Sequence, residues 1–268
     1  MAVMELRDVL VQNPLPFLLK GKKPQTEGRK ASDHDLRSTF PARMISVIIP
    51  AHNEEKYLGA TLEALEKQDY GWFEAVVVAN GCTDGTAEVA RGRCHRLIVL
   101  SQKSLGVARN LGARMAKGEV LVFLDADTLL DPWALKMIAW EFTKKHAAGT
   151  LRGRPDVGRL HYKLVYLLKN FEHRTQLHQG SSGVIICWRE SFIQSGGFDE
   201  RLEVRENSEL IWRLRRFGKY KYIDSARATT SMRRYDQQGW RRIVWMWCKL
   251  WFHTHFGDLH HRRYETVR

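Results

Sequence analysis

The sequence predicts an α/β fold, with a doubly wound, mostly parallel sheet flanked by helices. Two observations predict it. Short apolar runs rich in β-branched residues recur along the chain, at 45–49, 75–79, 97–100 and 120–124. Apolar residues at helical spacing follow the first and third runs, within 58–65 and 108–115. Continuous apolar strands alternating with amphipathic helices are typical of a parallel sheet covered on both faces.

The remaining pattern divides the chain into three parts. Residues 1–43 form a flexible basic lead-in, because 20–43 is rich in Lys, Arg, Pro, Ser and Thr and poor in core residues. The organised domain is predicted over 44–235, and 236–268 is predicted as an amphipathic aromatic and basic C-terminal helix. Beyond residue 150 the pattern also favours strands at 182–187, 220–223 and 226–230 and a helix at 207–217.

The composition restricts the partners and the compartment. The chain of 268 residues carries a net charge of +13, which indicates an anionic partner such as a nucleic acid, a membrane surface or a phosphorylated substrate. No apolar run is long enough to span a bilayer, and the first residues lack the layout of a signal peptide, so we expect a cytoplasmic location. The four cysteines form no C-x-x-C pair and are expected to be reduced.

Polar clusters follow the predicted strands, at the edge where ligands bind in such sheets. The first cluster runs from Pro50 to Glu55, and the second from Asn80 to Thr86. Helix capping alone explains the first about as well as ligand binding does, since Asn caps and acidic residues suit a helix N-terminus. A tight glycine turn explains the second equally well, although Asp84 could also bind a base or a ribose.

Asp125-Ala126-Asp127 follows the fourth strand and makes a sharper case. In an extended segment, residues two apart point the same way, so the two carboxylates would repel each other unless a cation lay between them. Mg²⁺ or Mn²⁺ binds carboxylate and phosphate oxygens, and would neutralise a departing nucleotide diphosphate. A solvated turn is the competing interpretation of this one motif.

Taken together, these motifs resemble the family 2 glycosyltransferases, which have a GT-A fold. The resemblance runs from about residue 44 to about 235. It rests on 47–55, on 80–86, on Gly106-Val107-Ala108-Arg109-Asn110 with Gly112, on 123–127, on 196–200 and on 206–213.

The resemblance implies an inverting transferase that takes a sugar from a nucleotide-diphosphate donor with a divalent metal. Asp127 would ligate the metal, with Asp125 on the metal or the ribose. The residues implied to bind the nucleotide are Pro50, His52, Asn53, Glu54, Asn80, Asp84, Arg109 and Asp125.

Two positions depart from the family pattern. Many members carry paired Asp where this chain has Ala79-Asn80, so that contact falls to Asn80 or is weaker. Many also carry Glu-Asp, with the Asp as catalytic base, where this chain has Glu206-Asn207. An amide takes up no proton at ordinary pH, so either Glu206 acts instead, or the acceptor needs no base, or catalysis is impaired.

The C-terminal segment adds an expectation about membranes. Trp240, Trp245, Trp247 and Trp251 are interleaved with basic residues, which favours peripheral binding to the cytosolic membrane face. Packing of this helix on the catalytic domain is the alternative. Nucleic acid is not expected as a partner, because it would leave the Asp-rich motifs unexplained.

The missing Asp at the base position, together with arginines just before the expected membrane-binding helix, suggests a lipid-linked acceptor. A lipid phosphate is already anionic and needs cations rather than a base, and Arg233 or Arg234 would hold it. A hydroxyl acceptor with Glu206 as the base is the competing hypothesis. A soluble or protein acceptor, and a sugar-nucleotide-binding protein without catalysis, also remain open.

Overall fold

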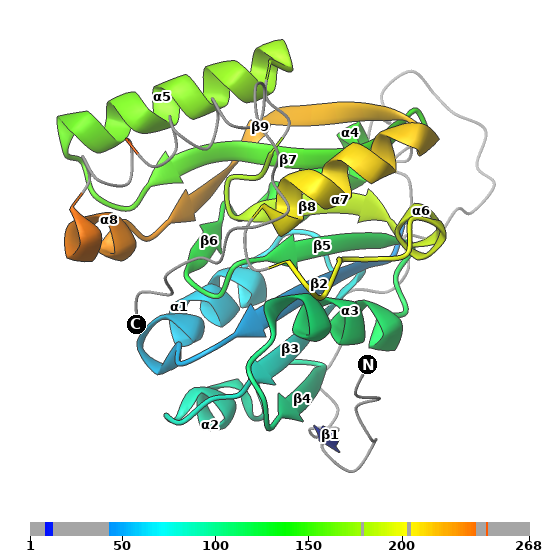
Figure 1. The fold of residues 1–268 in the computed structure, drawn as a ribbon, viewed down its shortest axis with the longest axis vertical. Helices are drawn as coiled ribbons and strands as arrows, with labels where there is room; N and C mark the ends of the chain where they lie inside the picture. Colours follow the sequence, from blue (N-terminus) through cyan, green and yellow to red (C-terminus); the bar gives the residue numbers. More distant parts are fainter. Residues whose placement is uncertain (1–8, 13–42, 178–179, 203–204, 240–244, 246–268) are drawn as a thin grey trace, which may run out of the picture.

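The computed structural model describes residues 9–12, 43–177, 180–202, 205–239 and 245 (Figure 1). The C-terminal helix predicted over 236–268 lies mostly outside these residues, apart from α8 (Arg233–Gln238). No helix within the described ranges is long and apolar enough to cross a membrane.

One mixed sheet organises the described chain, in the order β1-β4-β3-β2-β5-β8-β7-β9-β6. The predicted apolar runs are its centre: β2 (Ile45–Ala51), β3 (Phe73–Asn80), β4 (Arg96–Leu100) and β5 (Val120–Leu124). All four run parallel, with β2 between β3 and β5. Every residue of β2 and β5 is buried, as expected for strands covered on both faces. The α/β prediction is therefore confirmed.

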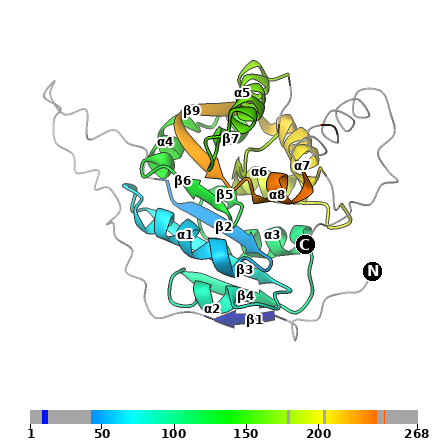
Figure 2. The same cartoon turned by 90° about the vertical axis from the view of Figure 1, so that its left-hand side faces the viewer.

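Helices cover both faces of this parallel half (Figures 1 and 2). They are α1 (Glu55–Glu66), α2 (Thr86–Ala90), α3 (Leu105–Met115) and α4 (Ala134–Glu141). Leu58, Leu62 and Leu65 of α1 join one core cluster with alternate residues of β2 and β3. Ala108 and Ala113 of α3 join a second cluster, on the opposite face, with Ile48, Val76 and Val78.

The second half of the sheet is mostly antiparallel. β8 (Val184–Trp188) runs antiparallel to β5 and β7 (His146–Pro155), and β6 (Thr128–Leu130) antiparallel to β9 (Lys219–Thr230). The two strands predicted at 220–223 and 226–230 are one strand, β9, whose pairing with β7 shifts register between Leu151 and Arg152. The pattern did not reveal β7, because its exposed Arg152 and Arg154 interrupt the apolar run.

The helices of this half are α5 (Leu160–Thr175), α6 (Arg189–Gln194) and α7 (Glu206–Leu214), which a 3-10 turn, Arg215–Phe217, extends. The predicted helix at 207–217 matches α7 and this turn. Within the predicted lead-in, β1 (Val9–Gln12) pairs antiparallel with β4 at the sheet edge. The domain boundary at residue 44 stays a prediction.

Candidate active site

The predicted polar clusters gather at one edge of the sheet. β2, β3 and β5 are parallel neighbours, so the loops that follow them emerge side by side. The loop after β2 is held to the loop after β3: the Asn53 side chain accepts from Thr83 N at 2.8 Å, and His52 Nδ1 lies 2.8 Å from the Asn80 carbonyl oxygen. Asn53 adopts a left-handed conformation (φ 56°), which Asn tolerates better than most residues.

Asp84 stabilises the same pair of loops. Its carboxylate accepts from the Glu55 amide at 3.2 Å and from the amide and hydroxyl of Thr86, the first residue of α2. Burial acts to raise the pKa of Asp84, but these hydrogen bonds outweigh it and the pKa is lowered. Asp84 therefore stays ionised and orders the loop predicted to bind the nucleotide.

Asn80 has a structural role at the position where many family members carry Asp. The residue is buried, and its Oδ1 accepts from Ser104 N at 2.8 Å. Ser104 in turn is the N-cap of α3, accepting from Val107 N. An amide serves this contact as well as a carboxylate would, since only an acceptor oxygen is needed.

Asp125-Ala126-Asp127 forms a turn between β5 and β6, and not the extended segment on which the sequence argument relied. The turn is pinned on several sides: Asp125 N donates to Gly183 O at 3.0 Å, and Thr61 Oγ1 donates to Ala126 O at 2.7 Å. The two carboxylates consequently pair with different arginine side chains. Asp125 pairs with Arg109 and Asp127 with Arg233, at 3.3 Å in each case.

The Asp125 carboxyl is strongly perturbed. Burial raises its pKa to about 6, Arg109 opposes the rise, and the nearby carboxylates of Asp127 and Glu206 add to it. The side chain nevertheless keeps 42% of its surface exposed, so a ligand can reach it. A carboxyl of this kind is poised to gain a cation, which would relieve the repulsion from its neighbours.

Asp127 lies in a second group with Glu54 and Arg233. Arg233 Nη2 forms salt bridges with Glu54 Oε1 and with Asp127 Oδ2, and its guanidinium lies 4.1 Å from the centre of the Tyr57 ring. Burial raises the pKa of both Glu54 and Asp127, and Arg233 opposes the rise. A single arginine thus bridges a residue predicted to bind the nucleotide and the residue predicted to bind the metal.

Arg109 connects the site to α7. Its side chain is only 4% exposed, and its Nη1 donates to Glu206 Oε1 at 3.0 Å and to Asn207 Oδ1 at 2.9 Å. Asn207 Nδ2 donates onward to Ser181 Oγ at 3.1 Å. The two residues at the family's base position are therefore held by a buried guanidinium, which also reaches Asp125.

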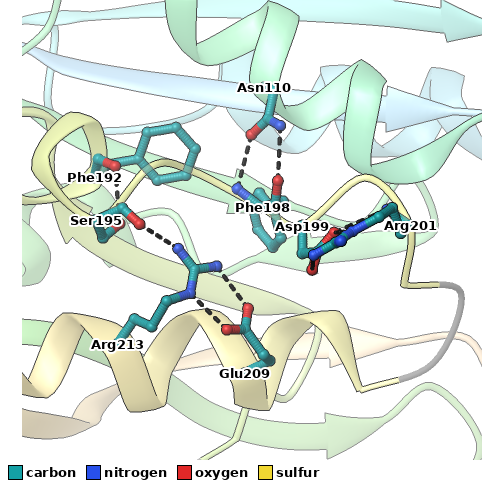
Figure 3. A network of polar contacts seen from close by, with 8 residues as sticks. All are labelled: Asn110, Phe192, Ser195, Phe198, Asp199, Arg201, Glu209 and Arg213. Atoms are coloured by element: carbon teal, nitrogen blue, oxygen red, sulfur yellow. Dashed lines mark hydrogen bonds and ion pairs between the residues drawn. The ribbon is translucent and has the colours of Figure 1, made fainter. Parts of the chain in front are cut away.

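The loop before α7 supports this arrangement (Figure 3). Asn110, next to Arg109 on α3, accepts from Phe198 N at 2.8 Å and donates to Phe198 O at 2.9 Å. The Phe198 ring then lies 5.0 Å from the Arg109 guanidinium. Farther along, Arg213 of α7 pairs with Glu209 and donates to the Ser195 carbonyl, which fixes the other end of the loop to the helix.

The residues present fit a divalent cation bound together with a substrate. No cluster of three or more His, Cys, Asp or Glu side chains placed to hold a metal occurs among the described residues. Mg²⁺, however, is commonly held by one or two carboxylates while substrate phosphates complete its shell. Asp125 and Asp127, whose carboxylates lie near enough to repel each other, would supply such ligands once they exchange their arginine partners for the cation. Within the described part of the chain, the buried Glu54 Oε2 has no hydrogen-bond partner, which leaves a further acceptor beside them.

The pKa of Asp125 predicts a pH-dependent stability. Its folded pKa, about 6, exceeds its ordinary 3.8, so the native state binds the extra proton between these values. This contribution is present below about pH 4 and is lost as pH rises through about 6. We expect Asp125→Asn to remove that slope, measured by urea unfolding of the metal-free protein at several pH values.

Asp84→Asn is the matched control, because the pKa of Asp84 is lowered. Its stabilising contribution is lost as pH falls through the folded pKa, so the variant should keep the wild-type slope between about pH 4 and 6. The same slope in wild type and Asp125→Asn would show that Asp125 does not carry the perturbed pKa.

The predicted site residues are mostly brought together. Arg233 pairs with Glu54 and with Asp127, and its neighbour Arg234 is exposed. Sequence reasoning missed Tyr57 and Ser181, and it included Phe198 in a family motif without a role. Tyr57 carries no motif signal, although its place in the first turn of α1 could have suggested that it faces the same loop edge.

The model of glycosyl transferase family 2 matches residues 46–202. This match spans more than half of the chain, and the chain belongs to that family. The sheet and its flanking helices are those of the GT-A fold.

The curated relatives are similar over only part of their length. A validoxylamine A glucosyltransferase of Streptomyces hygroscopicus subsp. limoneus is 39% identical over 128 residues, which is 44% of this chain and 28% of the relative. Glycosyltransferase GlyG of Streptococcus pneumoniae is 30% identical over 112 residues, 40% of this chain and 37% of the relative. The chain thus matches about a third of the length of these curated relatives.

Solved structures share the fold. The mannosyltransferase PcManGT of Pyrobaculum calidifontis, in complex with GDP-Man and Mn²⁺, superposes with a TM-score of 0.56 at 20% identity, covering 70% of this chain and 56% of that one. Residues 1–349 of S. aureus TarS, in complex with UDP-GlcNAc, give a TM-score of 0.54 at 22% identity, covering 70% and 58%.

Proposed function

We propose that this protein is an inverting glycosyltransferase that transfers a sugar from a nucleotide-diphosphate donor to a lipid-linked phosphate at the cytosolic membrane face. The observation that carries the proposal is the contact of Asp127 with Glu54 and Arg233 at the carboxyl end of β5. These contacts support the proposal, because they join a carboxylate suited to a metal, a residue of the segment proposed to bind the nucleotide and a cation suited to a phosphate.

The donor side follows from the family and from the loops. Asn53, Asp84 and the segment after β2 bind the nucleoside, and Asp125 and Asp127 hold a divalent cation. A bound Mg²⁺ or Mn²⁺ would neutralise the charge that develops on the nucleotide diphosphate as it leaves. The complex of PcManGT with GDP-Man and Mn²⁺ and that of TarS with UDP-GlcNAc support such a donor and metal.

The acceptor side follows from Glu206 and Arg233. Oε1 of Glu206 already accepts from Arg109, and Asn207 cannot take up a proton. The described site is therefore poorly equipped with a general base for a hydroxyl acceptor. A phosphate acceptor needs no base but needs a cation, and a guanidinium matches phosphate geometry. Arg233 supplies that cation. Its guanidinium lies over the Tyr57 ring and pairs with Glu54 and Asp127, carboxylates whose charge a bound metal would also neutralise.

The acceptor proposal predicts a difference between two adjacent arginines. Arg233→Ala should lower transfer to polyprenyl phosphate by roughly 10²-fold or more, because a charge-assisted contact to the reacting phosphate is lost. Arg234→Ala is the matched control and should retain most of the activity. Initial rates with a labelled donor measure both effects.

Glu206→Gln separates the proposal from the hydroxyl-acceptor alternative. With a phosphate acceptor it should keep substantial activity, since no proton has to be removed. A hydroxyl acceptor predicts the opposite results: Glu206→Gln loses most of the activity, Asn207→Asp raises the rate, and only a glycolipid or a soluble acceptor is glycosylated. These results would show that the lipid phosphate is the wrong acceptor.

A second candidate is a sugar-nucleotide-binding protein without catalysis, which Asn207 favours. Thermal-shift measurements with UDP-GlcNAc and GDP-Man, each with and without Mn²⁺, test donor binding for both candidates, because a ligand of the native state raises its melting temperature. Metal-dependent stabilisation followed by turnover supports the transferase. Stabilisation without turnover on any acceptor class supports the binding protein.

A further inference from the structure

The outward face of α5 is apolar, which is unusual for a surface helix. Helix α5 lies at the outer edge of the molecule in both views (Figures 1 and 2). Its inner face buries Tyr162, Tyr166 and His173. Five large apolar side chains, each between 54% and 81% exposed, recur at spacings of three and four: Leu160, Leu164, Leu167, Leu168 and Phe171. That spacing places them together on the side opposite the buried set.

This stripe continues past the helix end, where Leu177 is 69% exposed. Solvent-facing positions of a surface helix are ordinarily polar, and a contiguous apolar stripe on a soluble domain marks an interaction surface. Among the described residues, the inner face of α5 packs on β7 and on α8, and no contact there requires leucine on the outer face. The stripe therefore calls for a partner.

Basic groups border the stripe. Lys163 and Arg174 are exposed on α5 itself, while Arg159, just before the helix, is paired with Asp236. At its C-terminal end lies a hollow of about 340 Å³, whose lining includes Arg174, Lys219, Lys221 and Asp224. The acidic Asp224 pairs with Arg152, and Lys221 pairs with Glu141. Arg174 and Lys219 form no salt bridge within the described residues, so positive charge remains to meet an anion.

We propose that the apolar face of α5 docks on an anionic lipid bilayer, with the basic hollow at its C-terminal end taking an anionic headgroup. An exposed apolar helix face flanked by cations is the combination that binds a membrane interface. Charge complementarity selects this occupant over the chain's own Trp-rich segment 240–256, which is itself basic and would be repelled by the flanks of α5.

Helix α5 connects the proposed docking face with the candidate active site, because its inner face packs on α8. The N-terminal end of α5 packs on α8: Tyr162 Oη and Arg159 both donate to Asp236, and Tyr162, Tyr166, Met232 and Tyr235 form one apolar cluster. Helix α8 begins with Arg233. The inference extends the membrane location proposed above, but it rests on α5 and can be tested without donor or acceptor.

The test is co-sedimentation of the full-length protein with sucrose-loaded vesicles of phosphatidylcholine, alone or mixed with phosphatidylglycerol. The wild type should bind the mixed vesicles in preference. The triple variant Leu164→Ser/Leu168→Ser/Phe171→Ser should bind at least tenfold more weakly. The double variant Arg174→Ser/Lys219→Ser should lose the preference for phosphatidylglycerol. Ile193→Ser, which removes an equally exposed apolar residue from α6, should bind like the wild type.

Thermal melting and size-exclusion chromatography of the same proteins complete the test. The serine variants should melt within a few degrees of the wild type, because the replaced side chains are exposed and each substitution costs only about a few tenths of a kcal/mol in helix propensity. Wild-type and triple-variant proteins that bind vesicles equally would overturn the proposal. A wild type that does not bind vesicles would overturn it as well. In that case, a triple variant that melts much lower would indicate that the chain's own segment covers α5. A triple variant that passes from dimer to monomer would indicate that a second copy covers it. Vesicle binding without any sugar transfer would leave this inference standing and remove only the proposed function.

Discussion

Asp127→Asn is expected to reduce sugar transfer by about 10³-fold while the protein stays folded. A divalent cation at a departing diphosphate is worth several kcal/mol, and each 1.36 kcal/mol of barrier is about tenfold in rate. Asn keeps the shape of the side chain but lacks the charge that holds the cation. The loss should appear in kcat and in the Mn²⁺-dependent part of donor binding, measured by initial rates and by calorimetric titration.

Asp156→Asn is the matched control. Asp156 lies at the N-terminus of α8, the helix that begins with Arg233. Its Oδ1 accepts from Met232 N at 2.9 Å, a contact that Asn can also make. It should transfer sugar at close to the wild-type rate. Undiminished activity of Asp127→Asn, or of the wild type in excess chelator, would exclude a metal role for this residue.

Arg109→Met is expected to lower the free energy of unfolding by about 3–5 kcal/mol, because it removes the buried partner of the Glu206 carboxylate. The substitution also strips Asp125 of the cation that opposes its raised pKa. For a chain of this size the melting temperature should fall on the order of 10 °C. Differential scanning calorimetry and urea unfolding measure the two effects.

Arg93→Met provides the comparison, since Arg93 pairs with Glu66 at 3.2 Å on the surface and should lose only about 0–1 kcal/mol. The double variant Arg109→Met/Glu206→Gln should recover part of the stability, because it removes the charge that the single variant leaves unpaired. Equal stability losses for Arg109→Met and Arg93→Met would mean that the buried network contributes no more than a surface pair.

The parallel half of the fold was predictable because its signals are local. An apolar β-branched run such as 120–124 is buried on both faces wherever it pairs, so its burial can be read without knowing its neighbours. The antiparallel half was predicted less well. The exposed Arg152 and Arg154 concealed β7, and α5 was not predicted, because its exposed leucines hide the usual contrast between an apolar inner face and a polar outer face.

The sequence by itself determined the family, the four central strands and the positions of Asp84, Asp125 and Asp127 at strand ends, because motif order and strand burial are properties of neighbouring residues. Tertiary structure alone decided which charges meet. Arg109 lies 97 residues from Glu206, and Arg233 lies 179 residues from Glu54. Such pairs form only when separate elements pack, since a side chain's reach depends on where the backbone carries it. For the same reason, only the folded chain shows that Arg233 meets Glu54 and Asp127, and that the leucines of α5 face outward.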